Sequence, residues 1–169
     1  MKRYAGIGSR TAPMNILEKI RNIAQTLAHK GYICSTGGAL GCDKAFIDGT
    51  QIAGKYADLW LPWQYYNGYY TDNPDVEERH LEFTKKYHPA WHKCSESARI
   101  MHARNAQILL GDDLNDPVEF VVCWTPDGEM TGGTAQGLRI AIDYDIPIFN
   151  LGRNEDAVIQ RLYEFVNNS

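Results

Sequence analysis

A glycine-rich segment between an apolar run and a helical pattern most constrains how this chain folds. Ser35–Asp43 reads STGGALGCD, follows the apolar residues Gly31–Cys34 and precedes Lys44–Asp48, which opens a helical pattern. A small-residue loop between a strand and a helix leaves backbone N–H groups unpaired at the positive end of the helix dipole, and glycine permits close approach of a ligand. The segment therefore predicts either an anion-binding loop for a phosphate or a tight turn without a ligand.

Length and composition predict a single domain over residues 1–169. A net charge of −4 argues against a dedicated nucleic-acid binder but leaves room for a local basic groove. The four cysteines have no metal-finger spacing, which favours a reduced, cytoplasmic setting. No apolar run is long enough to cross a membrane, and the N-terminus enters a strand directly, so we expect neither a transmembrane helix nor a signal peptide.

Hydrophobic periodicity predicts strands alternating with helices, and hence a three-layer, Rossmann-like α/β fold with an open parallel sheet and helices on both faces. Strands are expected at 3–7, 33–35, 56–61, 117–124 and 146–151, and helices at 14–30, about 43–53, 97–110, 135–144 and 155–166.

The segment from about 63 to 90 departs from this alternation and is interpreted as an insertion over one edge of the sheet. Trp63–Tyr70 is rich in aromatic residues, and Asp75–Tyr87 is charged and expected to be helical. The aromatic cluster is typical either of packing within a surface lobe or of a platform for base stacking.

Three loops are expected at the carboxyl edge of the sheet, where ligands bind in folds of this kind. They are Gly8–Pro13, Thr36–Asp43 and Thr125–Thr134, and together they predict a site for a nucleotide or a phosphorylated sugar. Neither a GxGxxG spacing nor a Walker-type GK[ST] is present, so no NAD or ATPase cycle, and no other cofactor, is predicted. The histidines His88, His92 and His102 lack the regular spacing of metal ligands, so no metal site is assigned.

The same motifs resemble two known families. Gly6–Arg10, Ser35–Ala45 and Ala103–Leu109 resemble the GSR, SGxAxGxDxxAH and RNRxIxxL signatures of the DNA-processing protein A (DprA/Smf) Rossmann domain. Gly132–Gly137 is similar to the GGxGTxxE loop of the Lonely Guy (LOG) family. Both belong to the SLOG superfamily of nucleotide-related Rossmann folds, and the resemblance extends from Tyr4 to about Leu151, outside the insertion.

These resemblances imply single-stranded DNA binding or cleavage of an N-glycosidic bond in a nucleotide. The chain departs from both patterns. Phe46 stands where the DNA-processing family usually has histidine, and Gly137 stands where the Lonely Guy family has its catalytic glutamate. Gln136 is adjacent but cannot ionise, so the usual carboxylate for an oxocarbenium-like transition state is missing.

Candidate site residues follow from the three loops and the Ala103–Leu109 motif. Asp43 and Glu129 are the candidate catalytic carboxylates, and Asp43 is also a candidate for a ribose contact. Arg10 and Arg104 are candidate phosphate clamps, with salt bridges between loop and helix as the alternative. The predicted ligand-binding set is Gly8, Ser9, Arg10, Thr36, Gly37, Gly38, Ala39, Asp43, Lys44, Arg104, Asn105, Thr125, Gly132, Gly133, Thr134 and Gln136.

Three functions are compatible with these features. The preferred one is a module that binds a nucleotide or a nucleotide-derived signal for sensing or sequestration. The second is a nucleoside or nucleotide N-glycosidic hydrolase or transferase that uses Asp43 or Glu129. The third is single-stranded DNA binding through Lys2, Arg3, Arg10, Lys44 and Arg104, with Trp63–Tyr70 stacking on bases. The exposed aromatic residues also predict a homo-oligomer, most simply a two-fold dimer.

Overall fold

A five-stranded parallel sheet forms the centre of the computed structural model, which describes residues 2–169. The strands are β1 (Arg3–Gly8), β2 (Ile33–Thr36), β3 (Asp58–Leu59), β4 (Val121–Trp124) and β5 (Ile148–Asn150), in the spatial order β3-β2-β1-β4-β5. All neighbouring strands are parallel, and Ala5 of β1 pairs with Ser35 on one side and with Val121 on the other. The predicted α/β fold is confirmed.

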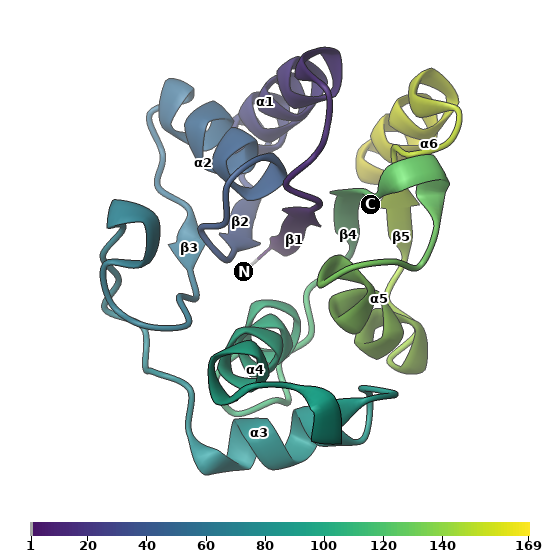
Figure 1. The fold of residues 1–169 in the computed structure, drawn as a ribbon. Coiled ribbons are helices and arrows are strands. Elements are labelled where there is room, and N and C mark those ends of the chain that lie inside the picture. The colour runs from purple at the N-terminus through teal and green to yellow at the C-terminus, as the bar shows by residue number, and fades with distance from the viewer. Residues whose placement is uncertain (1) are drawn as a thin grey trace.

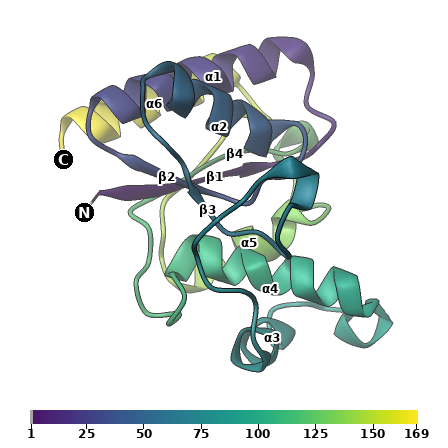
Figure 2. The same cartoon turned by 90° about the vertical axis from the view of Figure 1, so that its left-hand side faces the viewer.

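Helices cover both faces of this sheet, as Figures 1 and 2 show from two directions. One face carries α1 (Met14–His29), α2 (Cys42–Ile52) and α6 (Glu155–Asn167), and the other carries α4 (Glu96–Leu110) and α5 (Thr134–Asp143). The short helix α3 (Glu78–Lys85) packs on the outer side of α4. Three single-turn 3₁₀ helices lie in the connections: η1 (Tyr66–Gly68), η2 (Trp91–Lys93) and η3 (Pro126–Gly128).

The alternation of side chains along the central strands divides the interior into two hydrophobic cores. On β1, Tyr4 belongs to the core under α1, α2 and α6, whereas Ala5 and Ile7 belong to the core under α4 and α5. The ring of Tyr4 stacks on that of Phe120, with centroids 5.5 Å apart. Because both faces of the central strands are covered, residues 117–124 form a nearly continuous apolar run in the sequence.

The expected helices and strands are all present, and the differences lie at the strand ends. The strand expected at 56–61 is regular only over Asp58–Leu59, because it is an edge strand that pairs with β2 alone. The strand expected at 117–124 is regular only from Val121 onward, although the N–H of Glu119 already donates to the carbonyl oxygen of Arg3 at 2.9 Å; Pro117 has no N–H to donate. Helix α3 occupies the centre of the charged segment and begins with reciprocal hydrogen bonds between Glu77 and His80.

The segment from 63 to 90 leaves the sheet after β3, forms η1, and continues into α3 along the outside of α4 (Figure 2). That it is an insertion into a single domain remains a prediction. Within residues 2–169, no helix combines the length and the apolar character needed to span a membrane.

Helices α1 and α2 make close contact at Gly49. A Cβ atom at Gly49 would overlap the backbone oxygen of Arg21 and lie 2.8 Å from Cβ of Ala24. We therefore expect Gly49→Ala to lower the free energy of unfolding by about 1–3 kcal/mol in urea denaturation, despite the better helix propensity of alanine. Gly133→Ala is the control, because a Cβ there meets nothing within 4 Å, and it should change stability by less than about 0.5 kcal/mol. Equal stability of both variants would contradict the tight packing of α1 on α2.

Candidate functional site

The strand order reverses between β1 and β4, and this reversal defines the candidate site. The chain builds β2 and β3 on one side of β1, then crosses to β4 and β5 on the other side. The loop after β1 leads to α1 on one face, and the loop after β4 leads to α5 on the opposite face. The two loops therefore diverge and leave a crevice at the carboxyl ends of the strands, which is where ligands bind in open α/β sheets.

A cavity of about 410 Å³ lies in this crevice. Its wall comes from the three glycine-containing loops, α4 and the aromatic segment. Ten of the residues predicted from the sequence line it: Gly8, Ser9, Arg10, Ala39, Asp43, Arg104, Asn105, Gly132, Gly133 and Thr134. Eight further residues complete the wall: Ile7, Thr11, Tyr66, Ala98, Met101, His102, Pro126 and Thr131.

The loop between β2 and α2 holds an anion of the protein itself, the carboxylate of Asp43. Asp43 lies in the first turn of α2, is only 5% exposed, and accepts a hydrogen bond at Oδ2 from the N–H of Ala39 at 3.2 Å. Burial raises the pKa of Asp43 to about 6, although Arg104 and the N–H groups of Ala39, Gly37 and Gly8 act to lower it. Because this loop already binds a carboxylate, it has less capacity for a ligand phosphate than the other two loops.

Arg104 of α4 fixes the same loop from the other side. Its Nη1 donates hydrogen bonds to the carbonyl oxygen of Gly37 and, at 3.4 Å, to that of Trp60. Its Nε donates to Oδ1 of Asn105 at 3.2 Å, and the guanidinium lies 5.6 Å from the ring centre of Tyr66. Arg104 is thus a nearly buried structural cation that also lines the cavity.

The loop after β1 contributes an unpaired cation and two hydroxyl groups. Arg10 is exposed and makes no ion pair within residues 2–169. The hydroxyl groups of Ser9 and Thr11 lie 2.8 Å apart, and the Ser9 hydroxyl also accepts the N–H of Thr11 at 3.1 Å. Because Arg10 lines the cavity and has no ion pair within residues 2–169, its guanidinium is available for an anion there.

The loop after β4 presents an uncapped helix N-terminus. Gly132 has a φ of 68°, and no side chain of the described residues 2–169 caps the first N–H groups of α5 at Gly133. Asn105 joins α4 to this loop, since its Nδ2 donates to the carbonyl oxygen of Gly133 at 3.2 Å. The free N–H groups and the dipole of α5 therefore favour negative charge at this side of the cavity.

The aromatic segment packs on the loop before α2 and reaches the cavity. Nδ2 of Asn67 donates to the carbonyl oxygen of Gly38 at 3.0 Å, and Tyr66 lines the cavity. Tyr65 and Asn67 both have left-handed backbone conformations, which are uncommon outside glycine and cluster at functional sites. Trp63 is 43% exposed and Tyr65 is 71% exposed, so the segment also leaves aromatic surface free.

Several predicted site residues lie outside the cavity wall, at the protein surface or in the loop before α2. Lys44 is exposed and pairs with Asp48 at 2.7 Å, and Glu129 is exposed with its carboxylate 3.8 Å from Arg153. Thr36, the last residue of β2, is buried, as are Gly37 and Gly38 in the loop before α2. Roles of these residues toward a ligand remain predictions.

Two other predicted residues are buried and bound to neighbouring elements. Oγ1 of Thr125 accepts a hydrogen bond from Nδ2 of Asn150 at 2.8 Å, which joins the ends of β4 and β5. Gln136 donates to the carbonyl oxygen of Thr84 at 3.3 Å and accepts from Arg139 at 3.0 Å. Gln136 therefore ties α5 to α3 and is absent from the cavity wall.

Sequence reasoning missed His102 and the group to which it belongs. Ligand-type atoms of His88, Cys94 and His102 all lie within 4.8 Å of one another, and His102 also lines the cavity. Burial lowers the pKa of His102 to about 4, with smaller contributions from His88 and Arg139. No regular spacing connects these three residues in the sequence, because a loop and a helix supply them separately.

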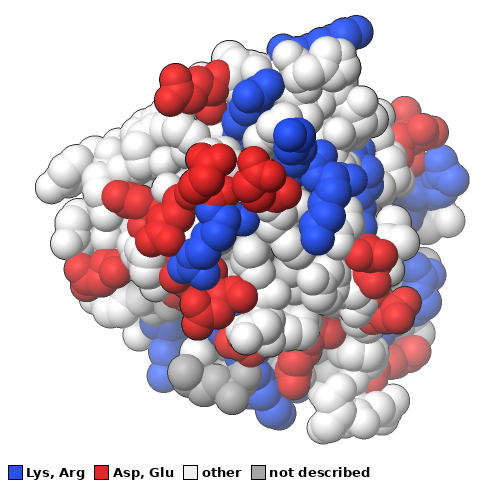
Figure 3. Space-filling view, turned by 90° about the horizontal axis from the view of Figure 1, so that it is seen from below, with Lys and Arg blue, Asp and Glu red and all other residues white. Residues whose placement is uncertain are grey.

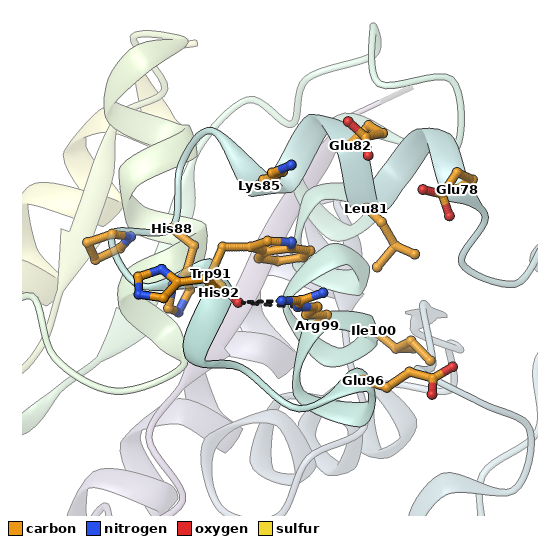
Figure 4. A pocket seen from close by; sticks show the side chains of 11 residues that line it. Glu78, Leu81, Glu82, Lys85, His88, Trp91, His92, Glu96, Arg99 and Ile100 are labelled. Atoms are coloured by element: carbon orange, nitrogen blue, oxygen red, sulfur yellow. Dashed lines mark hydrogen bonds between the residues drawn. The ribbon is translucent and has the colours of Figure 1, made fainter.

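A second hollow, of about 700 Å³, lies away from the sheet edge between α3, η2 and α4 (Figure 4). Its wall mixes the apolar side chains of Leu81, Trp91 and Ile100 with acidic and basic residues. Acidic and basic side chains are also interspersed on the face seen from below (Figure 3). Near the start of α3, Arg79 pairs with Glu77 at 2.9 Å and with Asp112 at 2.6 Å.

Comparison with known proteins shows a similarity of fold. No model of a protein family matches the sequence, and no curated protein matches it. One solved structure, of DNA processing protein A from Helicobacter pylori, matches with a TM-score of 0.55 and 17% identity. The match covers 99% of this chain and 79% of that one. The chain has a DprA-like Rossmann fold. The Helicobacter pylori protein has a unique single-stranded DNA binding mode.

The buried carboxylate of Asp43 predicts a specific pH dependence of stability. The pKa of Asp43 is about 6 in the folded state, above its ordinary value of 3.8, so the folded state binds this proton more tightly. The contribution of Asp43 to the free energy of unfolding is therefore fully present below about pH 4 and is lost as the pH rises through about 6.

Asp43→Asn removes this titration. In urea denaturation, the stability of the wild type relative to the variant should fall by roughly 2–3 kcal/mol between pH 4 and pH 7. Other titrating groups, His102 among them, are present in both proteins and cancel in the difference. Parallel pH profiles would show that Asp43 is not buried as described.

Proposed function

We propose that the protein binds a nucleotide, or a signalling molecule derived from one, in the cavity between the loops after β1 and β4. The observation that carries the proposal is the position of this cavity at the reversal of strand order. Beside it, among residues 2–169, Arg10 has no ion pair and the N-terminus of α5 has no side-chain cap. Both features favour an anion. A volume of about 410 Å³ lies within the range of small-molecule sites.

The wall of the cavity suggests a division of roles. The phosphate group would lie between Arg10 and the N–H groups of Gly132–Thr134. Among residues 2–169, Arg10 has no ion pair and these N–H groups have no hydrogen-bond acceptor. Asp43 and Asn105 supply a carboxylate and an amide for a ribose or a base edge, and Tyr66 supplies an aromatic face. This arrangement serves sensing or sequestration without requiring any chemical step.

The first test of this proposal is a binding comparison. A panel of nucleosides and nucleoside mono-, di- and cyclic phosphates is titrated by calorimetry into the wild type, Arg10→Ala and Arg161→Ala. Loss of one charged hydrogen-bond donor is worth about 1.5–3 kcal/mol, so Arg10→Ala should weaken phosphorylated ligands about 10- to 100-fold. Arg161, an exposed arginine of α6 outside the cavity wall, is the matched control. Absence of binding to every member of the panel at millimolar concentration would refute the proposal.

An N-glycosidic hydrolase or transferase activity of the Lonely Guy type is an alternative function for the same cavity. Asp43 is the carboxylate in the cavity wall, and its pKa of about 6 suits a group that exchanges a proton near neutral pH. Glu129, the other candidate, lies outside that wall. Chromatography of the titrated samples for released base separates catalysis from simple binding.

A second candidate function is single-stranded DNA binding, which is favoured by the structural match to DNA processing protein A. The exposed aromatic residues Trp63 and Tyr65 lie in the same segment as Tyr66 of the cavity wall. Of the cations expected to form a groove, Lys2 and Arg3 lie at the amino end of β1, across the sheet from Arg10. Lys44 pairs with Asp48, and Arg104 is nearly buried. The proposed DNA surface is therefore restricted to Arg10 and the aromatic segment.

Stacking and salt dependence test this second function. If bases stack on Trp63, then Trp63→Ala should weaken binding of a short oligonucleotide about 5- to 100-fold in fluorescence anisotropy at low salt. Tyr56→Ala is the control, because Tyr56 is 85% exposed and lies before β3, outside the aromatic segment. The affinity should also fall as the salt concentration rises. Equal effects of both variants would contradict a specific stacking surface.

A homodimer remains part of the proposal. The exposed side chains of Trp63, Tyr65 and Tyr70 are apolar surface that a second copy of the chain would cover. Light scattering with and without nucleotide distinguishes a dimer interface from a lid that acts within one chain.

A further inference from the structure

We propose that His88, Cys94 and His102 form a binding site for one zinc ion. The inference is independent of nucleotide or DNA binding. It rests on three side chains that each offer one ligand atom, with all three atoms within 4.8 Å of one another. His88 follows α3, Cys94 follows η2, and His102 lies in α4. The zinc ion would therefore join the connection between α3 and α4 to helix α4 itself.

The donor set matches the chemistry of zinc. One thiolate and two imidazoles are borderline-soft ligands of the kind that bind Zn²⁺ in proteins. Zinc–sulfur and zinc–nitrogen bonds of about 2.3 and 2.0–2.1 Å place tetrahedral sulfur and nitrogen ligands about 3.6 Å apart. Nε2 of His88 lies 3.7 Å from Sγ of Cys94, and the ring centroids of His88 and His102 are 4.5 Å apart. Small side-chain rotations therefore complete the site, with loss of the Cys94 thiol proton.

Two existing hydrogen bonds must change when zinc binds. The Cys94 thiol donates to the carbonyl oxygen of Ala90 at 3.6 Å, and this bond is lost with the thiol proton. The N–H of Ala90 donates to Nδ1 of His88 at 3.0 Å. Coordination through Nε2 requires the proton on Nδ1, so Ala90 must then donate elsewhere. Ala90 is only half-buried, so water can accept this hydrogen bond.

Neighbouring contacts already hold the connection in place. Arg139 donates from Nε to the carbonyl oxygen of Tyr87 at 2.8 Å, directly before His88. Arg99 donates to the carbonyl oxygen of Trp91 at 3.0 and 3.2 Å, and these bonds are drawn in Figure 4 together with His88 and His92. The backbone on both sides of His88 is thus anchored to α5 and α4 without zinc, which lowers the entropic cost of forming the site.

Three protein ligands leave a fourth coordination position for water or an added ligand. Because His102 also lines the cavity between the β1 and β4 loops, the zinc ion would lie next to that cavity. The site would therefore fix the orientation of a cavity residue and place a divalent cation beside the proposed nucleotide.

The test uses the full chain, purified without a histidine tag and stripped with a chelator. Zinc is titrated against a chromophoric chelator, and cobalt(II) is used as a spectroscopic probe. We expect one equivalent of zinc at micromolar free metal, and a cobalt complex with a thiolate charge-transfer band and tetrahedral visible bands. Cys94→Ala and His88→Gln should each weaken zinc binding by at least about 100-fold.

His92→Gln is the matched control, since His92 lies in the same connection but outside the cluster, and it should bind zinc like the wild type. Circular dichroism establishes that each variant is folded. The cobalt spectrum of the wild type tests the thiolate ligand even where a variant fails to fold. Absence of stoichiometric zinc in the wild type, cobalt binding without a thiolate band, or an equal loss in His92→Gln would overturn the proposal.

Discussion

The carboxylate of Asp43 inside the loop before α2 is the constraint on which the sheet edge depends. Removing an ionised carboxylate from water is costly, and backbone N–H groups and the charge of Arg104 offset only part of this cost, so the pKa of Asp43 stays above its ordinary value. Arg104 in turn bonds the carbonyl oxygen of Gly37, so α4 on one face and α2 on the other are joined through this loop. The loop is therefore closed by groups of the protein itself. The open donors lie in the loops after β1 and β4.

The fold follows from local sequence patterns. Helical periodicity in residues 14–30, a nearly continuous apolar run up to Trp124 and glycine-rich loops after the strands are all local signals. Each predicted element is present, with shorter strands at β3 and β4 than predicted. The parallel sheet then brings the carboxyl ends of the strands to one edge. This is why the predicted residues Gly8, Asp43 and Gly133 meet in one cavity although they are distant in sequence.

The remaining features of the site depend on tertiary contacts. The glycine pattern around residues 36–41 is the same whether a phosphate or Asp43 occupies the loop, and only the orientation of the Asp43 side chain decides between them. The same is true of Gln136, whose amide faces α3, and of Lys44, which pairs along its own helix. The grouping of His88, Cys94 and His102 depends on how the connection after α3 folds back onto α4, for which the spacing of the residues holds no signal.

The pairing of β1 with β4 has a consequence for how the protein folds. Ala5 pairs with Val121, so the first strand gains this neighbour only after most of the chain has been synthesised. Contacts between such distant residues require closure of a long loop before they contribute any stability, and this slows folding. The two walls of the crevice are the loops that follow β1 and β4, so the crevice forms only when these two strands pair. An incomplete chain on the ribosome, even one with α1 and α2 already packed on β1 and β2, therefore lacks the ligand site.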